Sequence, residues 1–362
     1  MNFNFEIIGI SFPFWVMLFV SIIFSCLVTW FSIPTIVKVA GLKKLFDVPN
    51  ERTSHVTTTP ILGGLSIFAG FTLSAILFTM PGDSNEIKYI IGAIIVLFFA
   101  GLKDDILIID PVKKIFSQII AALIIVVVAD IRISNFHTAI GIENISYISS
   151  ILFTIFLIIT LINGFNLIDG VDGLTSAIGI ITSLFFGIWF LLTRHYTFAI
   201  LCFSLIGSLA AYFIFNVFGK KNKVFMGDTG SMIIGLVISI FAIKFLEFEN
   251  SAPLNLQFHA SPALAFGLLI IPLFDTLRII ILRLRNGGSP FAADRNHVHH
   301  NLLKLGYSHL KVTTLTVFIN LIFIILVIFS QRLGSVLLIL ITLSLATVLS
   351  ALLEIILKRR RL

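Results

Sequence analysis

Most of this chain consists of long apolar runs, and their length limits the folds it can adopt. About eleven such runs alternate with short polar loops along the 362 residues. A transmembrane helix needs about 20 mainly apolar residues, because only helices and closed barrels satisfy their own backbone hydrogen bonds in hydrocarbon. We therefore expect an all-α, polytopic integral membrane protein with about eleven transmembrane helices, the third and fourth being the shortest. The runs lie at residues 12–40, 61–80, 89–101, 115–129, 148–168, 174–193, 196–218, 231–246, 262–282, 312–330 and 334–357.

The composition supports this class. Apolar residues make up 58% of the chain and charged residues 12%, which no soluble core of this length requires. The first run has no basic region before it, so we expect it to remain as a span and not to be removed as a signal peptide. The two cysteines, Cys26 and Cys202, lie inside apolar runs and imply no disulfide.

Lysine and arginine are concentrated in alternate loops. One set of loops, together with the carboxyl-terminal tail, holds most of them, whereas the other set holds little beyond Lys88, Arg132, Arg194 and Arg332. By the positive-inside rule the amino terminus is outside and the carboxyl terminus is cytosolic. The net charge of +7 then reflects topology and not nucleic-acid binding. We expect one transmembrane catalytic domain, 1–362, with its active site on the cytosolic face and cytosolic loops at 41–60, 102–114, 163–173, 219–230 and 283–311.

The loop at 163–173 places carboxylates and carboxamides at the mouth of the membrane. Charged groups at membrane segments are costly and tend to mark function. Asn166, Asp169 and Asp172 are spaced three apart, so on a helical turn they would share one face. Oxygen ligands on one face suit Mg²⁺, which substrate phosphates often complete. The alternative is a capped helix start, in which these side chains only satisfy free backbone amides.

Two further loops carry acidic groups. Asp104 and Asp105 are adjacent, so they are either solvated or held by a cation, and the four residues before Asp110 exclude an Asp-Asp-x-x-Asp signature. Asp228 could cap a helix or face an anion site at the helix start. Lys113, with the next lysine, could draw a lipid phosphate to the membrane surface or serve only as a topology anchor.

The first and last of the expected cytosolic loops, 41–60 and 283–311, carry basic and histidine side chains. His55 precedes the pair Gly63 and Gly64, which could simply allow close helix packing. The loop at 283–311 joins arginines to a His-x-His-His run, which could hold a structural zinc or recognise phosphate and sugar. No cysteine accompanies the run, so we favour phosphate or sugar recognition. The basic side chains concerned are Arg283, Arg285, His297, His299 and His300.

These motifs, taken in order, closely resemble those of the polyprenyl-phosphate N-acetylhexosamine-1-phosphate transferases (glycosyltransferase family 4), which include the WecA and TagO types and the related MraY. The resemblance covers most of the chain, from about residue 43 to 305. The His-Val-His-His form after Ser-Pro-Phe is similar to the WecA side, since the MraY side usually has three consecutive histidines and a lysine in the first loop. The motifs are His55 to Gly64, Asp104-Asp105, Asn163 to Leu174, Phe225 to Ser231, and Ser289 to His300.

The resemblance implies an Mg²⁺-dependent transfer of an N-acetylhexosamine 1-phosphate, most simply GlcNAc 1-phosphate, from a UDP-sugar to undecaprenyl phosphate with release of UMP. Mn²⁺ is an alternative metal. Such an enzyme would lie in the bacterial cytoplasmic (inner) membrane among membrane lipids and initiate a lipid-linked glycan such as O-antigen, common antigen or teichoic acid. A homodimer is common in the family, and no nucleic-acid partner is implied.

The resemblance also implies roles for individual residues. Asp228 matches the metal ligand, with Asn166 as second contact, and Asp104 and Asp105 match the catalytic pair. A direct transfer and a two-step route through an aspartyl-phosphate both remain open. The other matching positions would bind substrate: Asp172 and Phe225 the uracil, Arg283, Arg285, His297 and His300 the diphosphate and sugar, and also His55, Lys113, Asp169 and His299.

Other functions fit less well. An MraY-like phospho-MurNAc-pentapeptide transferase is the alternative within the family. A secondary transporter would place ionisable groups near the bilayer middle, usually in repeated halves, and no repeat is seen here. A scaffold protein has no use for polar clusters on one side of the membrane. The sequence leaves the identity of the UDP-sugar and the glycan pathway open.

Overall fold

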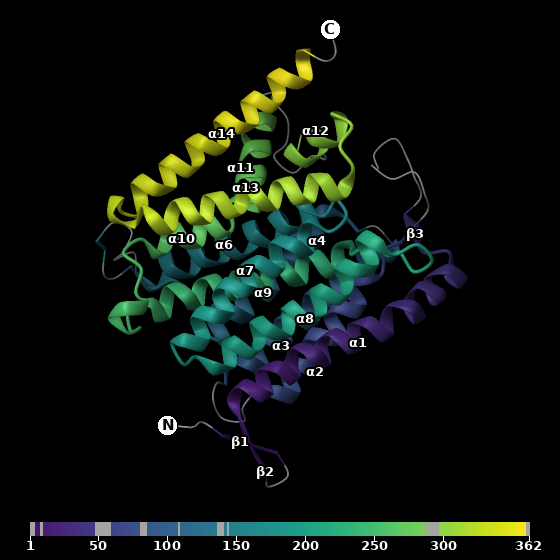
Figure 1. Ribbon diagram of the computed structural model, residues 1–362, viewed down its shortest axis with the longest axis horizontal. Helices are drawn as coiled ribbons and strands as arrows, with labels where there is room; N and C mark the ends of the chain where they lie inside the picture. The colour runs from purple at the N-terminus through teal and green to yellow at the C-terminus, as the bar shows by residue number, and fades with distance from the viewer. Residues whose placement is uncertain are drawn as a thin grey trace.

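The computed structural model describes residues 4–7, 10–47, 59–79, 85–107, 109–135, 141–142, 145–285, 287 and 297–359. Most of them are helical (Figure 1). The long helices are α1 (Phe14–Lys43), α2 (Gly63–Phe78), α3 (Glu86–Leu107), α4 (Pro111–Leu123) continued by a π-helical turn (Ile124–Val128), α6 (Tyr147–Ile168), α7 (Leu174–Leu192), α8 (Tyr196–Phe218), α9 (Gly227–Glu249), α11 (Ile270–Arg285), α13 (His309–Phe329) and α14 (Ser335–Arg359).

Short elements complete the described chain. They are a hairpin of β1 (Asn4–Ile7) and β2 (Ile10–Pro13), a bridge between β3 (Phe46–Asp47) and β4 (Thr59–Pro60), the helices α10 (Ser261–Leu268) and α12 (Val298–Lys304), and 3-10 turns at Leu254–Leu256 and Gln331–Leu333.

The prediction of an all-α, polytopic membrane protein is confirmed. Each of the predicted apolar runs coincides with a helix. Within the described ranges, 8 helices are long and apolar enough to cross a membrane, and the bent pair of α10 and α11 makes up to 9. The other two helices on apolar runs are α2, which has only 16 residues, and α3, which carries charged residues near both ends.

Helix α9 forms the centre of the bundle. In Figure 1 it lies between α1 and α14, which form opposite sides. Its most apolar window is 83% buried, compared with 28% for α14. Gly235 permits this close packing, because a Cβ there would lie 2.6 Å from Ile162 Cα of α6. Large apolar side chains such as Trp15 and Phe31 of α1 are exposed, as expected for residues that face lipid.

A bend of 63° separates α10 from α11. Pro272 lacks the N–H that would bond to Leu268, and its ring crowds that carbonyl, so the helix breaks nearby. Asn320 of α13 compensates, since its side-chain amide donates to the carbonyls of Gly267 and Leu268 at 3.1 and 3.4 Å. A polar residue in an otherwise apolar helix thus satisfies the broken backbone.

Because successive long helices alternate in direction, one end of the bundle collects particular helix ends. The carboxyl-terminal ends of α3, α6, α8 and α11 and the amino-terminal ends of α4, α7 and α9 lie there. We call this the site end, because the polar side chains described below belong to these helix ends. β3 and α12 lie at this end as well, away from the β1–β2 hairpin (Figure 1).

Candidate functional site

The centre of the site is the ammonium group of Lys114, in the first turn of α4. Its Nζ lies 3.1 Å from Asp104 Oδ2 of α3 and 2.7 Å from Asp228 Oδ2 of α9. It also donates to Asn166 Oδ1 of α6 at 3.5 Å. Oxygens from three helices therefore converge on one cation.

Asn166 links this cluster to the start of α9. Its Nδ2 donates to Asp228 Oδ1 and, at 2.9 Å, to Ser231 Oγ. One turn earlier on α6, Asn163 donates to Gln118 Oε1 of α4 at 2.8 Å. These contacts hold α4, α6 and α9 together at the level of the site, so Asn166 is fixed from both sides.

Asp105 has a different environment from Asp104. Its carboxylate accepts hydrogen bonds from the backbone N–H groups of Asp228 and Thr229, at 2.7 and 3.1 Å, and from Thr229 Oγ1 at 2.5 Å. It therefore caps the amino terminus of α9, where free N–H groups and the helix dipole favour a negative charge. The chain enters α9 through Gly227, whose φ of +73° suits glycine.

Two other glycines bring the backbone of α9 close to its neighbours. A Cβ on Gly64 would lie 2.3 Å from Gly230 N, and a Cβ on Gly101 would lie 2.5 Å from Thr229 Cα. The N–H of Gly64 also donates to Met226 O at 2.8 Å. The pair Gly63 and Gly64, identified in the sequence, thus packs α2 directly against the start of α9, which carries Asp228.

The turn after α6 divides the acidic residues predicted to share a helical face. α6 ends at Ile168, and Gly173, with a φ of +79°, is the N-cap residue before α7. Asp172 has different partners from Asn166: its Oδ2 accepts from Lys223 Nζ at 2.6 Å, and its N–H donates to His309 Nδ1 at 3.2 Å. The single-face prediction is wrong for Asp172, because the helical periodicity ends before it.

Phe225 lies in the loop before α9, beside this second group. Its N–H donates to Pro60 O at 2.7 Å and its carbonyl accepts from Gly63 at 2.8 Å. The ammonium of Lys223 lies 5.6 Å from the ring centroid. Asp172, Lys223 and Phe225 thus form a second polar and aromatic group at the site end. The predicted role of Asp172 and Phe225 in holding uracil stays a prediction.

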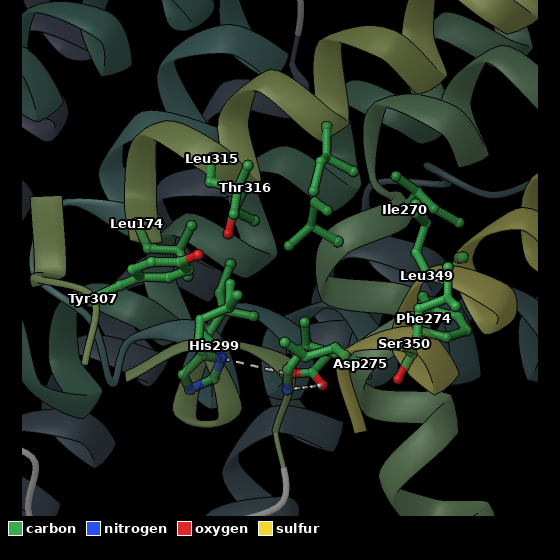
Figure 2. A pocket seen from close by; sticks show the side chains of 18 of the residues that line it. Leu174, Ile270, Phe274, Asp275, His299, Tyr307, Leu315, Thr316, Leu349 and Ser350 are labelled. Atoms are coloured by element: carbon green, nitrogen blue, oxygen red, sulfur yellow. Dashed lines mark hydrogen bonds and ion pairs between the residues drawn. The ribbon is translucent and has the colours of Figure 1, made fainter. Parts of the chain in front are cut away.

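The histidines lie on and just before α12 and meet a carboxylate of α11. His297 Nδ1 lies 3.0 Å and His299 Nδ1 3.5 Å from Asp275 Oδ2, while the N–H of Val298 donates to Asp275 Oδ1 at 3.1 Å. Figure 2 shows Asp275 and His299 at one edge of an apolar pocket of about 350 Å³ between α11, α13 and α14. The histidines thus contact a buried acid.

These histidines also reach the turn after α6. A Cβ on Gly170 would lie 3.2 Å from His299 Nε2 and 3.2 Å from His300 Cε1. Burial, together with the neighbouring histidines, lowers the pKa of His300 to about 3. Because Gly170 has no side chain, the rings of His299 and His300 can approach it closely. The two rings therefore lie beside the residue that follows Asp169.

Burial also changes the acidity of the carboxyl groups that lie outside the apolar parts of the helices. It raises the pKa of Asp105 to about 7, with the charge of Asp228 adding to the effect and the hydrogen bonds from Thr229 and Asp228 opposing it. Burial raises the pKa of Asp104, and Asp228 raises it further. Burial raises the pKa of Asp169 well above its usual value. Such a concentration of acidic groups favours a bound cation.

The residues fit a hard divalent cation. The ammonium of Lys114 lies among oxygens of Asp104, Asp228 and Asn166, the ligand type that Mg²⁺ prefers. Within the described ranges no three His, Cys, Asp or Glu side chains form a metal site by themselves. This pattern suits Mg²⁺, which is commonly held by one or two carboxylates and completed by phosphate oxygens and water.

Several predicted residues lie at the edge of the site or outside the described chain. Lys113 is exposed and does not take part in the cluster, which instead contains Lys114. Arg283 and Arg285 lie in the last turn of α11, half-buried and exposed respectively. His55 and the segment 288–296 lie outside the described residues.

Three contacting residues were not singled out from the sequence: Lys223, His309 and Asp275. Only Asp275 carries a clear signal, because it is the one acidic residue in the apolar run 262–282 and ionisable groups in such runs tend to be functional. Lys223 and His309 lie in polar loops, where the sequence does not distinguish them from topology anchors or surface residues.

Comparisons with known proteins agree with this arrangement. A family model described as glycosyl transferase family 4 matches residues 87–246. The undecaprenyl-phosphate alpha-N-acetylglucosaminyl 1-phosphate transferase of Yersinia pestis is 32% identical over 274 residues, which are 75% of this chain and 73% of that protein. The protein of the same name from Escherichia coli (strain K12) is 31% identical over 75% of this chain and 72% of its own length.

A mycobacterial relative extends the similarity. The decaprenyl-phosphate N-acetylglucosaminephosphotransferase of Mycobacterium leprae is 30% identical over 313 residues, 80% of this chain and 78% of that protein. The matched region of the family model contains the carboxylates on α3, the α6–α7 turn and the start of α9. Together, the extent of these similarities and the site assembled from the matched region show that the chain belongs to glycosyl transferase family 4.

Proposed function

We propose that this protein transfers N-acetylglucosamine 1-phosphate from UDP-N-acetylglucosamine to undecaprenyl phosphate and releases UMP. An oxygen of the lipid phosphate would attack the phosphorus that carries the sugar, and the bond from that phosphorus to UMP would break. The names of the relatives support the acceptor and the sugar. The motifs support the UDP donor, and the oxygen ligands at the site end support the dependence on Mg²⁺.

One observation carries the proposal: Asp104, Asp228 and Asn166 converge on the ammonium of Lys114 at the site end of the bundle. Phosphoryl transfer needs charge neutralisation and positioning more than covalent chemistry from the protein. A cationic side chain among acidic oxygens provides both a place for a divalent cation and a direct contact for phosphate. A transporter or scaffold does not explain this grouping.

We assign the individual roles from these contacts. Asp228 and Asn166 would hold Mg²⁺, which when bound neutralises the charge of the diphosphate. Lys114 would then turn from the carboxylates to a phosphate oxygen, and Asp104 would orient the acceptor phosphate. That phosphate is mainly dianionic at neutral pH, so it needs no strong base. Asp105 contributes by holding the start of α9, and hence Asp228, in place.

The two flanking groups would bind the two ends of the donor. Asp172 and Phe225 would hold uracil by hydrogen bonding and stacking, and Lys223 would give up its ion pair with Asp172 in doing so. On the other flank, His299 and His300 approach the same turn from α12 and would meet the sugar. The diphosphate would lie between them, above the carboxylates and within reach of the arginines at the end of α11.

The membrane arrangement follows from the same proposal. We place the site end in the cytosol, because the loops there hold most of the lysines and arginines. All eleven predicted runs would then cross the membrane, including the short α2 and the charged α3. The protein would lie in the bacterial inner membrane, where a water-soluble UDP-sugar meets a lipid phosphate.

A purified-protein assay tests the proposal. The protein in detergent is supplied with UDP-N-acetylglucosamine and Mg²⁺, and UMP is measured with and without a polyprenyl phosphate. We expect UMP release only with the lipid, and its loss in Asp228→Asn. Asp130→Asn is the matched control, because Asp130 is exposed and pairs with Arg132 at the opposite end of the bundle. UMP release that does not depend on the lipid would contradict the transfer.

A parallel series with UDP-N-acetylgalactosamine and UDP-MurNAc-pentapeptide decides the sugar. Turnover of the pentapeptide donor in preference to UDP-N-acetylglucosamine would favour the MraY-like alternative.

A further inference from the structure

Asp275 is the buried acid closest to the histidines, and the proposed transfer gives it no role. It lies on α11, three residues after the proline that follows the bend, and is 3% exposed. The pocket beside it is lined mainly by leucine, isoleucine and phenylalanine (Figure 2). A carboxylate in such surroundings is costly unless it is paired and hydrogen-bonded. Its partners therefore define its function.

All of its recorded partners belong to the histidine segment. Oδ1 accepts from the N–H of Val298 at 3.1 Å, and Oδ2 lies 3.0 Å from His297 Nδ1 and 3.5 Å from His299 Nδ1. The rings of His297 and His299 are nearly parallel, with an interplanar angle of 15° and centroids 5.3 Å apart. One carboxylate therefore holds both rings and the start of α12.

This pairing fixes which nitrogen of each ring carries hydrogen. A carboxylate only accepts hydrogen bonds, so Nδ1 of each ring must donate. In a neutral imidazole, Nε2 is then left as an acceptor. Burial lowers the pKa of His299, which favours the neutral ring.

The free nitrogen of His299 points at the proposed donor site. Its Nε2 is buried and has no hydrogen-bond partner in the described chain. It faces the turn at Gly170, where a Cβ would lie 3.2 Å away. Buried polar atoms are rarely left unpaired, so an unpartnered acceptor at this place indicates a ligand that donates a hydrogen bond.

We propose that Asp275 is a positioning residue that holds His297 and His299 with Nδ1–H toward its carboxylate, so that His299 Nε2 accepts a hydrogen bond from a hydroxyl or amide N–H of the donor sugar. This inference rests on the proposed function, because it takes a UDP-sugar as the donor. It adds Asp275, a residue of a membrane helix, to the site. It also assigns the direction of one hydrogen bond: His299 accepts from the sugar and does not donate to phosphate.

The variant Asp275→Asn tests the positioning role. An amide can present N–H to His299 Nδ1, which leaves hydrogen on Nε2 and reverses its polarity. We expect kcat/KM for the UDP-sugar to fall about 10- to 100-fold, as when the carboxylate behind a functional histidine is lost. UMP binding should change less than about twofold, since UMP lacks the sugar. The control is Thr276→Val on the same helix, whose hydroxyl donates to Pro272 O within α11.

A double variant separates positioning from a general loss of structure. If Asp275 acts through His299, adding His299→Ala to Asp275→Asn should cost less than about threefold more, because interacting residues are non-additive. Losses that multiply, or an Asp275→Asn enzyme that equals Thr276→Val, would overturn the proposal.

If Asp275→Asn does not fold, two replacements of His299 test the positioning role instead. Asparagine places an amide near the former Nδ1 and keeps the contact with Asp275, whereas glutamine places its amide near the former Nε2. Donor binding is measured by calorimetry without acceptor. We expect His299→Asn to lose donor affinity by about tenfold and His299→Gln to retain more of it; unchanged affinity in His299→Asn would refute the proposal. Calorimetry needs no turnover, so a wild type that binds the UDP-sugar without releasing UMP would refute only the proposed function.

Discussion

Replacement of Gly101 by alanine is a sharp test of how the site is held together. A Cβ at Gly101 would lie 2.5 Å from Thr229 Cα, 2.6 Å from Thr229 N and 3.0 Å from the carbonyl carbon of Asp228. These are backbone atoms at the start of α9, so no side-chain rotation relieves the overlap. Ordinary contact begins at 3.4 Å, so α3 and α9 must separate by about 0.9 Å.

That separation acts directly on the cap that Asp105 provides. The hydrogen bond from Thr229 N to Asp105, now 3.1 Å, would lengthen to about 4 Å and be lost. Asp104 and Asp228 would also move apart around Lys114. A misplacement of about 1 Å costs about 100-fold in rate, and overpacking costs about 1–3 kcal/mol of stability. We therefore expect a fall of about 100-fold in kcat/KM with a protein that still folds.

Gly92→Ala is the matched control. Gly92 lies on the same helix, and a Cβ there would meet nothing within 4 Å. Alanine favours a helix over glycine by about 1 kcal/mol, so this variant should match or exceed the thermal stability of the wild type and keep its activity. UMP release and thermal unfolding in detergent measure both effects. Near-wild-type activity in Gly101→Ala would show that the close approach of α3 and α9 does not position the site.

Four further outcomes follow from the cluster around Lys114. Excess chelator should abolish turnover, and Mg²⁺ or Mn²⁺ should restore it; full turnover in chelator would exclude the metal. Asp228→Ala should lose metal-dependent turnover yet remain folded, as judged by size-exclusion chromatography, and a near-normal rate would show that the ligand assignment is wrong. Lys114→Met should reduce kcat on the order of 10²-fold, because it removes a charge that would contact phosphate. Replacement of the exposed neighbour, Lys113→Met, should have little effect. Equal effects of the two variants would contradict this geometry. Asp104→Asn should depress kcat by orders of magnitude while UDP-sugar affinity changes little, and the opposite result would place Asp104 at the nucleotide.

The sequence predicts the helices well, because each apolar run of sufficient length has few alternatives to a helix in a membrane. It does not predict the bend between α10 and α11. Pro272 marks a break in hydrogen bonding, but the direction and the 63° angle depend on how Asn320 and the neighbouring helices pack. Such tertiary contacts leave no periodic pattern in the run itself.

The sequence does not predict which of two adjacent residues in a motif enters the site. Successive residues on a helix point about 100° apart, so two neighbours rarely reach the same site. Asp104 faces Lys114 while Asp105 caps α9, and Lys114 enters the cluster while Lys113 faces outward. Helix geometry predicts that only one member of each pair faces the site. It does not predict which one, because that depends on the rotation of each helix against its neighbours.

The central place of α9 has a consequence for biosynthesis. A polytopic chain enters the membrane from its amino terminus, so α1 to α8 are inserted before the helix around which several of them pack. Lys244 of α9 is buried, and its Nζ lies 2.8 Å from Glu86 Oε1 at the start of α3. This ion pair forms only when α9 is inserted, after α3. The contacts of α3 and α6 with α9 therefore form only after both helices have been inserted, whereas α1, α2, α7 and α8 can pack against one another earlier. A nascent chain arrested before α9 would therefore lack the helix on which α3 and α6 pack and the lysine that pairs with Glu86.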